Sequence, residues 1–117
     1  MWIITLRSIK QFAEQHPQQA NSLYAWSTVV EQALWQCPND IRKTWGSVDI
    51  IHTAKSVLPK GDCRAIFDIG GNHLRLVAHV NFLYQSVYVK DCLTHGEYDK
   101  INWETYKYEI KEKSHEK

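Results

Sequence analysis

The pattern of residues 67–80 constrains the fold more than any other part of the chain, because it predicts two strands joined by a tight turn. Gly70 and Gly71 adopt positive φ angles without steric cost, and Asn72 tolerates the same region. After the turn, side chains alternate between two faces of a strand. The core face would carry Leu74, Leu76, Ala78 and Val80, and the working face would carry His73, Arg75, Val77 and His79.

The length and composition of the chain predict one globular domain without a strongly charged surface. The 117 residues are enough for one core but not for two. Hydrophobic residues make up 44% and charged residues 23%, which is ordinary for a globular protein. The formal net charge of only +1 gives no general sign of a nucleic-acid-binding protein.

The cysteines and the apolar runs indicate a reducing compartment and no membrane segment. Cys37, Cys63 and Cys92 are odd in number and form no CxxC pair, which fits free thiols in the cytoplasm. No apolar run approaches the ~20 residues that a membrane helix needs, and the first residues lack the pattern of a secretion signal. We therefore expect a cytoplasmic protein with no membrane partner. A zinc site of Cys63, Cys92 and histidines lacks a ligand pair with finger-like spacing, so we expect no metal and no other cofactor.

The first residues predict a short strand and then a helix. Residues 2–4 are a short apolar run, and the hydroxyl of Thr5 is placed to accept a free backbone N–H at the start of a helix. Apolar residues recur at helical spacing over residues 6–13. This helix should end near His16, because a residue before proline avoids the helical region, and Pro17 suits the first turn of the next helix.

A second and a shorter third helix follow. A broad apolar stripe over residues 23–34 predicts a helix that forms an antiparallel hairpin with the first and lies on a sheet. Residues 38–45 predict a third helix, with Gly46 as a plausible stop. We expect a loop over residues 47–62, in which residues 48–51 could form a strand fragment.

The second half of the chain predicts a meander of three strands over residues 64–69, 73–81 and 85–92. Residues 94–103 predict a turn and a short helix, and the polar end of the chain should fray. The fold class is therefore α+β. An N-terminal strand and two or three helices would pack on one face of a mainly antiparallel sheet, with a short C-terminal helix.

The register of the last hairpin decides which side chains share the working face. If the turn centres on Tyr84 and Gln85, antiparallel pairing puts His79 opposite Lys90. Arg75 and Lys90 would then lie on one face. A shift of one residue would reverse this arrangement.

Two motifs together resemble one protein family. Residues 67–77 read Phe-Asp-Ile-Gly-Gly-Asn-His-Leu-Arg-Leu-Val, and residues 94–99 read Thr-His-Gly-Glu-Tyr-Asp. This pair resembles the HigB family of bacterial toxins, in the RelE/ParE superfamily of type II toxin–antitoxin systems. The likeness covers roughly residues 1–101, which we expect to form a RelE-like domain, and residues 102–117 are a polar extension.

The resemblance implies an mRNA interferase, a small endoribonuclease that cleaves mRNA, in many family members on the ribosome, and inhibits translation. Its partners would be mRNA, the ribosome and a HigA-type antitoxin with a helix-turn-helix domain. Operator DNA would be bound only through the complex with the antitoxin. Metal-free cleavage would start with attack of a 2′-OH and give a 2′,3′-cyclic phosphate and a 5′-OH.

His95 is the first choice for proton transfer, because histidine titrates near neutral pH and this one lies in the second motif. The alternative is a histidine that only caps the turn before a helix. Tyr98 follows three residues later, so a helix would place both side chains on one face. It could stack on a base, orient the phosphate or simply pack against the sheet. Asp99 could orient His95 or cap the last segment.

Arg75 is the best candidate for holding phosphate, because a guanidinium binds phosphate through two parallel hydrogen bonds and stays charged. The alternative is a surface arginine paired with Asp68 across the hairpin. Lys90 could add a second cation for catalysis on the same face. RNA contacts are predicted for Lys55, Lys60, Arg64, Asn72 and His73, although Asn72 could serve only the turn.

Two other functions remain open for this sequence. The first is a non-catalytic toxin of the ParE kind that binds DNA gyrase. The second is an inactive module that only binds its antitoxin. A Ser or Cys hydrolase has no supporting constellation of residues.

Overall fold

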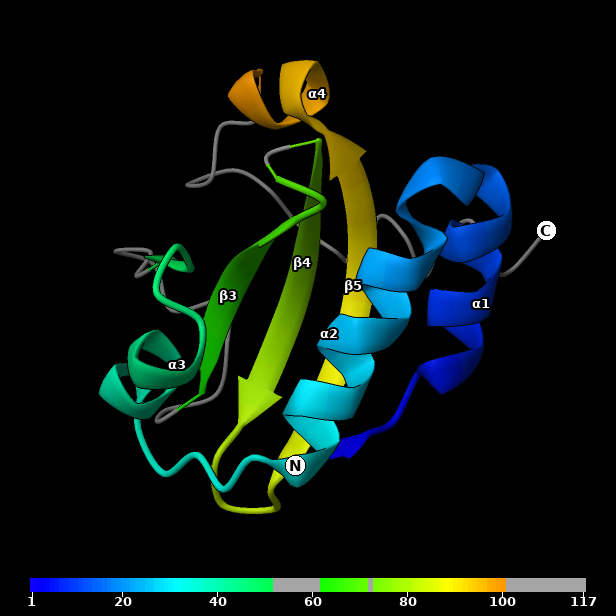
Figure 1. Ribbon diagram of the computed structural model, residues 1–117. Helices are drawn as coiled ribbons and strands as arrows, with labels where there is room; N and C mark the ends of the chain where they lie inside the picture. Colours follow the sequence, from blue (N-terminus) through cyan, green and yellow to red (C-terminus); the bar gives the residue numbers. More distant parts are fainter. Residues whose placement is uncertain (52–61, 72, 101–117) are drawn as a thin grey trace, which may run out of the picture.

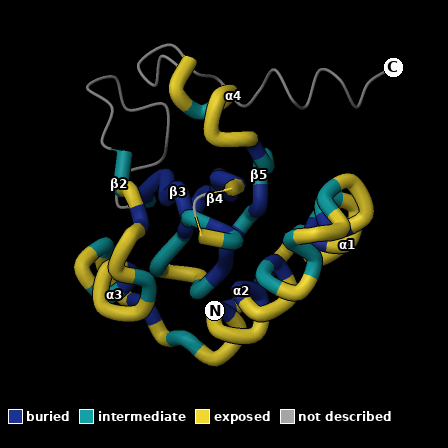
Figure 2. Tube along the Cα trace, turned by 45° about the horizontal axis from the view of Figure 1, so that its top comes forward, coloured by how far each residue is buried: buried dark blue, intermediate teal, exposed yellow. Residues whose placement is uncertain are grey.

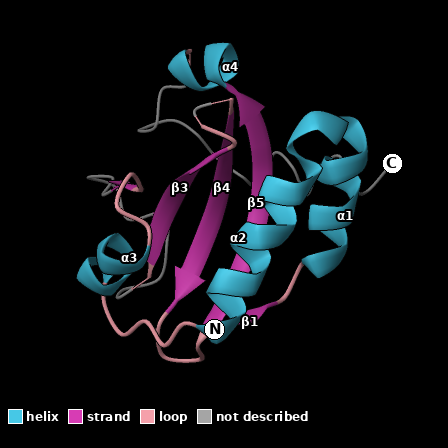
Figure 3. Ribbon diagram, in the orientation of Figure 1, coloured by secondary structure: helices cyan, strands magenta, loops and turns pink. Residues whose placement is uncertain are grey.

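The computed structural model describes residues 1–51, 62–71 and 73–100. It has an α+β fold in which a five-stranded sheet is covered on one side by helices (Figures 1 and 3). The sheet order is β1-β5-β4-β3-β2. The elements are β1 (Trp2–Ile3), α1 (Leu6–Gln15), the 3₁₀ turn η1 (Pro17–Gln19), α2 (Ala20–Gln32), α3 (Pro38–Thr44), β2 (Asp49–Ile51), β3 (Cys63–Ile69), β4 (Leu74–Asn81), β5 (Ser86–Thr94) and α4 (His95–Asp99).

The hairpin of β3 and β4 forms the centre of the sheet, as its alternating pattern predicts. Asp68 lies opposite Arg75 in an antiparallel register. Gly70 and Gly71 take φ angles of 67° and 63°, the left-handed region that favours glycine in a tight turn. The predicted α+β class is confirmed, but the sheet is wider than a three-stranded meander. It gains β1, which pairs in parallel with β5, and β2, which pairs with β3.

The main core lies between the helices and the sheet, and buried residues gather along β3, β4 and β5 in Figure 2. Phe67 stands at its centre, with three tryptophan rings around it. The ring centroids of Trp26, Trp35 and Trp45 lie 5.2, 6.1 and 6.2 Å from that of Phe67. Large aromatic side chains bury much area each, so a small domain gains a substantial core from few residues.

The opposite face of the sheet carries a second, smaller apolar cluster. Ile66, Val77 and Leu93 are buried there, and Ile51 and Tyr98 pack against them. The predicted division of β4 into a core face and a working face therefore holds. The working face has an apolar floor of its own beneath its polar side chains.

The helices form where the sequence predicts them, with two differences. The first helix, α1, ends at Gln15, just before His16 and Pro17. Pro17 begins the 3₁₀ turn η1, and the α-helical part of the second helix starts only at Ala20. The third helix, α3, ends at Thr44, and the strand fragment predicted around residues 48–51 is β2.

Thr5 precedes α1, but the prediction that its hydroxyl caps that helix is wrong. The side chain makes no capping hydrogen bond to α1. Instead, its Oγ1 accepts the N–H of Val89 in β5, at 2.6 Å. The strand β1 ends at Ile3, and the Thr5 hydroxyl adds one more hydrogen bond to β5 just beyond it.

The predicted register of the last hairpin is also wrong. His79 lies opposite Tyr88 and not opposite Lys90, because the turn over residues 82–85 centres on Leu83 and Tyr84, one residue earlier than predicted. Gln85 ends this turn with a φ of 53°. A β-bulge follows, since Val77 pairs with Asp91 while Ala78 pairs with Val89. Lys90 is the additional residue at this bulge.

The last described element is a short helix at the end of the sheet. The short helix predicted after residue 94 is α4, and it caps the end of the sheet in Figure 1. Within the described ranges, no helix is long and apolar enough to cross a membrane. Most of the loop predicted over residues 47–62, namely residues 52–61, and the extension over residues 102–117 lie outside the described residues.

Candidate active site

Arg75 lies at the centre of a polar cluster on the working face of the sheet. Its Nε is 3.1 Å from Asp68 Oδ1, and its Nη2 is 3.3 Å from His95 Nδ1. The guanidinium carbon lies 5.2 Å from the centroid of the Tyr98 ring, within the range of a cation–π contact. The structure thus brings together three of the four predicted catalytic residues, namely Arg75, His95 and Tyr98.

Two pieces of local structure hold this cluster in place. The register of β3 and β4 sets Asp68 opposite Arg75. The helix α4 supplies His95 and Tyr98 from positions three residues apart, so both side chains point to one side. A capping box fixes the start of α4, because Thr94 Oγ1 accepts the N–H of Glu97 and the Glu97 carboxylate accepts the N–H of Thr94.

The imidazole of His95 has a different partner at each nitrogen. Arg75 has only donors, so the contact at Nδ1 places a lone pair there. The other nitrogen, Nε2, is 3.4 Å from Asp99 Oδ2, one helical turn away. The side chain of His95 is 54% exposed. The ring is therefore oriented by the protein and open to a substrate.

The hydroxyl of Tyr98 is bound by a carboxylate outside the Arg75 pair. Its Oη donates to Asp49 Oδ2 at 2.6 Å, which joins α4 to the edge strand β2. Partial burial, followed by this hydrogen bond to a carboxylate, raises the pKa of Tyr98 above its usual value. The phenol therefore stays protonated at neutral pH, and its ring is held over the guanidinium.

Lys90, the fourth residue predicted to be catalytic, makes a different contact. It lies two residues after Tyr88 in β5, and its Nζ lies 5.1 Å from the centroid of that ring. Its ammonium is thus directed toward Tyr88. The predicted role of Lys90 in catalysis stays a prediction.

The residues predicted to contact RNA have different environments. His73 is exposed in the turn next to Arg75. Arg64 is only 1% exposed, on the working face of β3. Lys55, Lys60 and Asn72 lie outside the described residues. The RNA-binding roles of all five stay predictions.

Two members of the site could not be found from the sequence. Asp49 contacts Tyr98 from 49 positions away, and only the pairing of β2 with β3 brings it there. Tyr88 lies beside His79 because of the register of β4 with β5, and Lys90 reaches its ring from two residues further along β5. Neither residue belongs to a motif, so no local signal marks it.

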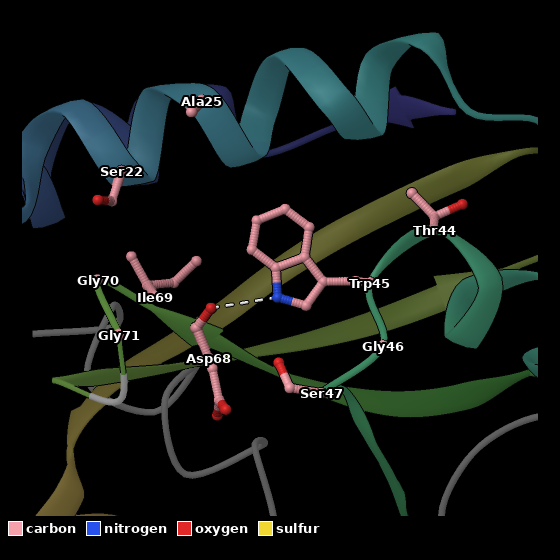
Figure 4. A pocket seen from close by; sticks show the side chains of 10 residues that line it. All are labelled: Ser22, Ala25, Thr44, Trp45, Gly46, Ser47, Asp68, Ile69, Gly70 and Gly71. Atoms are coloured by element: carbon pink, nitrogen blue, oxygen red, sulfur yellow. Dashed lines mark hydrogen bonds between the residues drawn. The ribbon is translucent and has the colours of Figure 1, made fainter.

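A cleft of about 550 Å³ lies next to the Arg75 cluster, between α2, the segment after α3 and the β3–β4 turn (Figure 4). Trp45 forms one wall, and its Nε1 donates to the backbone oxygen of Asp68 at 3.2 Å. Gly70 and Gly71 form the rim. The cleft thus shares Asp68 with the Arg75 cluster.

Among residues 1–51, 62–71 and 73–100, no three His, Cys, Asp or Glu side chains gather as a metal site would need.

Comparison with known proteins identifies the family. Residues 19–101 match the family model of the HigB toxin, described as the RelE-like toxic component of a toxin-antitoxin system. The chain belongs to the HigB toxin family. The matched part runs from α2 through α4 and includes Arg75, His95 and Tyr98. The family predicted from the two sequence motifs is thereby confirmed.

Curated members of the HigB family are similar over most of their length. The mRNA interferase toxin HigB of Escherichia coli K12 is 31% identical over 99 residues, which cover 85% of this chain and 88% of the relative. The mRNA interferase HigB of Shigella flexneri gives the same values. The mRNA interferase HigB of Escherichia coli O6:H1 is 28% identical over 101 residues, or 86% of this chain and 91% of the relative. As the toxin of such a system, this HigB family member implies a cognate antitoxin.

Proposed function

We propose that this HigB family member is an mRNA interferase that cleaves mRNA on the ribosome in the cytoplasm and so stops translation. One observation carries the proposal: the guanidinium of Arg75 contacts both the acid–base side chain of His95 and the ring of Tyr98. A phosphate ligand beside a proton-transfer group is what cleavage of RNA through its own 2′-OH requires. The names of the curated relatives support the same activity.

Arg75 holds the scissile phosphate. Its fork can make two parallel hydrogen bonds to phosphate oxygens and remains charged at any relevant pH. Asp68 binds its Nε, and its guanidinium carbon lies 5.2 Å from the centroid of the Tyr98 ring. The Nη groups therefore meet the substrate, although Nη1 donates to the backbone oxygen of Leu74 at 3.4 Å in the free protein. A cation already oriented in this way stabilises the extra negative charge that develops on phosphorus.

His95 removes the proton from the attacking 2′-OH. In the free protein, Nδ1 accepts from Arg75. When Arg75 turns its Nη2 to the phosphate, the lone pair of Nδ1 becomes available to the 2′-OH. Asp99 at Nε2 keeps the required tautomer and stabilises the imidazolium that forms.

The bond between O2′ and phosphorus then forms while the bond from phosphorus to O5′ breaks. The proton of the 2′-OH ends on His95, and the leaving 5′-oxygen takes a proton from solvent at this exposed end of the sheet. The products are a 2′,3′-cyclic phosphate and a 5′-OH, and the step uses His95 as the base, solvent as the acid and no metal ion. Tyr98 serves as a positioning residue, since its raised pKa and its bond to Asp49 make it a poor acid.

A HigA-type antitoxin with a helix-turn-helix domain neutralises the toxin. The complex of the two proteins represses its own operon, and the toxin meets operator DNA only through the antitoxin. This part of the proposal rests on membership of a toxin–antitoxin family.

The test is primer extension on a reporter mRNA after brief induction of the chain, with Arg75→Ala and His95→Gln as matched variants. Each variant should fold as the wild type does, judged by circular dichroism. We expect new 5′ ends within translated regions for the wild type only. Those fragments should carry a 5′-OH, detected by their labelling with polynucleotide kinase without prior phosphatase treatment.

Other outcomes would point elsewhere. Growth arrest without new 5′ ends would overturn the nuclease and favour binding to DNA gyrase. No arrest and no cleavage would leave an antitoxin-binding module. Full toxicity of both variants would remove Arg75 and His95 from the mechanism.

A further inference from the structure

A second group of aromatic and charged side chains lies on the working face, away from Arg75. The rings of His79 and Tyr88 have centroids 5.9 Å apart, and the Nζ of Lys90 is 5.1 Å from the Tyr88 centroid. His79 Nε2 is 2.6 Å from Asp62 Oδ2, which fixes the orientation of the imidazole. Tyr88 thus contacts both a restrained imidazole and the ammonium of Lys90.

Lys90 joins this group because it lies two residues after Tyr88 in β5, and alternate residues of a strand share a face. Tyr88 lies opposite His79, so this is the working face. The β-bulge is adjacent, since Val77 pairs with Asp91 and Ala78 with Val89, which leaves Lys90 as the inserted residue. The contact between Lys90 Nζ and the Tyr88 ring shows that the ammonium stays with this group at the bulge.

The group is too far from the first cluster to act on the same phosphate. Arg75 and His79 lie on one face of β4 and are four residues apart, which is about 13 Å along a strand. Between them runs the apolar floor of Ile66, Val77 and Leu93. A strand of RNA bound at Arg75 and crossing this floor would reach Tyr88 and Lys90 with another nucleotide.

The chemistry of the group suits a nucleotide. Proteins bind single-stranded RNA by stacking bases on aromatic rings and by placing cations along the backbone. Tyr88 is half-buried, so its ring is fixed and still reachable. Lys90 already covers the π face of that ring, and its flexible stem lets the ammonium move aside to a phosphate while a base takes its place.

We propose that Tyr88 and Lys90 form a subsite for an mRNA nucleotide outside the scissile bond, with the base stacked on Tyr88 and the phosphate bound by Lys90. Asp62 and His79 support the ring from behind. Lys90 is then a substrate-binding residue and not a catalytic one. The proposal rests on the proposed cleavage of mRNA and adds the part of the sheet that holds the message.

The test separates binding from chemistry. Single-turnover cleavage is measured on ribosomes programmed with a short message, over a range of toxin concentrations. We expect Tyr88→Leu and Lys90→Gln each to raise the half-saturating concentration about 5-fold or more, because stacking and phosphate contacts of this kind are worth at least that factor. The maximal rate should stay within about 2-fold in both. Tyr88→Phe keeps the ring and should match the wild type.

A second measurement is independent of cleavage. Fluorescence anisotropy with a labelled, fully 2′-O-methylated single-stranded RNA should show weaker binding for Tyr88→Leu but not for Tyr88→Phe. For Lys90→Gln, the slope of log K against log salt should fall by about 0.7, as expected for the loss of one phosphate contact.

The outcomes are distinct. Unchanged half-saturation and unchanged anisotropy in both variants would overturn the subsite. A Lys90→Gln variant with normal half-saturation and a maximal rate lowered 100-fold would also overturn it and place Lys90 at the scissile phosphate. Failure of the wild type to cleave would refute the proposed function, and the anisotropy series would then decide the subsite alone.

Discussion

Arg75 makes three interactions that a lysine could not reproduce together. Its Nε binds Asp68, its Nη2 binds His95, and its plane lies against Tyr98. An ammonium is a point charge without this fork. We expect Arg75→Lys to lower the cleavage rate at least about 10-fold, even though the positive charge is kept. Rates are measured on programmed ribosomes, and a variant with more than half of the wild-type rate would contradict a role for the fork.

The thiols offer a prediction that depends on pKa. Burial, with a smaller effect of the nearby Asp62 or Asp91 carboxylate, raises the pKa of Cys63 and of Cys92 to about 12. A thiol reacts as its thiolate, so both should be inert at pH 8, whereas Cys37 is exposed. A disulfide reagent should therefore modify one thiol quickly in the folded protein and all three in denaturant.

The same raised pKa values predict how stability depends on pH. In the unfolded chain the thiols of Cys63 and Cys92 ionise at a lower pH than in the folded protein. The free energy of unfolding should therefore fall as pH rises from 9 toward 12.

At the level of elements, the five-residue helix α4 carries two of the proposed site residues, His95 and Tyr98. It is too short to be stable alone, so its capping box and its contacts with the sheet must hold it. We expect Thr94→Ala to lower the cleavage rate several-fold, because the loss of a cap costs about 1 kcal/mol and loosens His95 and Tyr98. The Tm should fall by at most a few degrees, since α4 contributes little to the core. Thr94→Ser keeps the hydroxyl and should behave as the wild type. Equal losses in both variants would contradict the capping argument.

Elements with a strong local signal could be predicted from the sequence. The alternation after Gly70 and Gly71 gave the central hairpin, because a period of two has one physical meaning in a strand. Pro17 marked the end of α1, since it excludes the helical region for His16. The motif at residues 94–99 gave a short helix with His95 and Tyr98 on one side.

Features set by distant contacts could not be predicted. The register of β5 with β4 depends on where the turn between them is centred and on a bulge, and no residue in the sequence marks either position. The hydroxyl of Thr5 had two possible uses, and the parallel pairing of β1 with β5 decided between them. Asp49 joins the site only because β2 pairs with β3.

At the level of the whole molecule, the two faces of the sheet have separate tasks. The helices cover one face, where the main core lies (Figure 1). The other face carries Arg75 and the Tyr88 group, with His95 at its end. Phe67 and Asp68 are neighbours in β3, and their side chains point to opposite faces. Packing around Phe67 therefore sets the position of the carboxylate that orients Arg75.

This arrangement leads to a prediction about stability and activity together. Phe67 is fully buried and contacts Trp26, Trp35 and Trp45. Phe67→Leu should lower the free energy of unfolding by about 1–3 kcal/mol, because it loses aromatic contacts and leaves a small cavity. Urea unfolding followed by tryptophan fluorescence measures this change. The cleavage rate of the folded variant should fall several-fold, since β3 shifts beneath Asp68.

The matched control is Leu83→Ala, at a position that is 81% exposed and outside the core. It should change the free energy of unfolding by no more than about 0.5 kcal/mol and leave cleavage unchanged. If Phe67→Leu loses stability but cleaves at the wild-type rate when fully folded, the two faces of the sheet are mechanically independent. In that case, the ion pair with Asp68 holds Arg75 without support from the core.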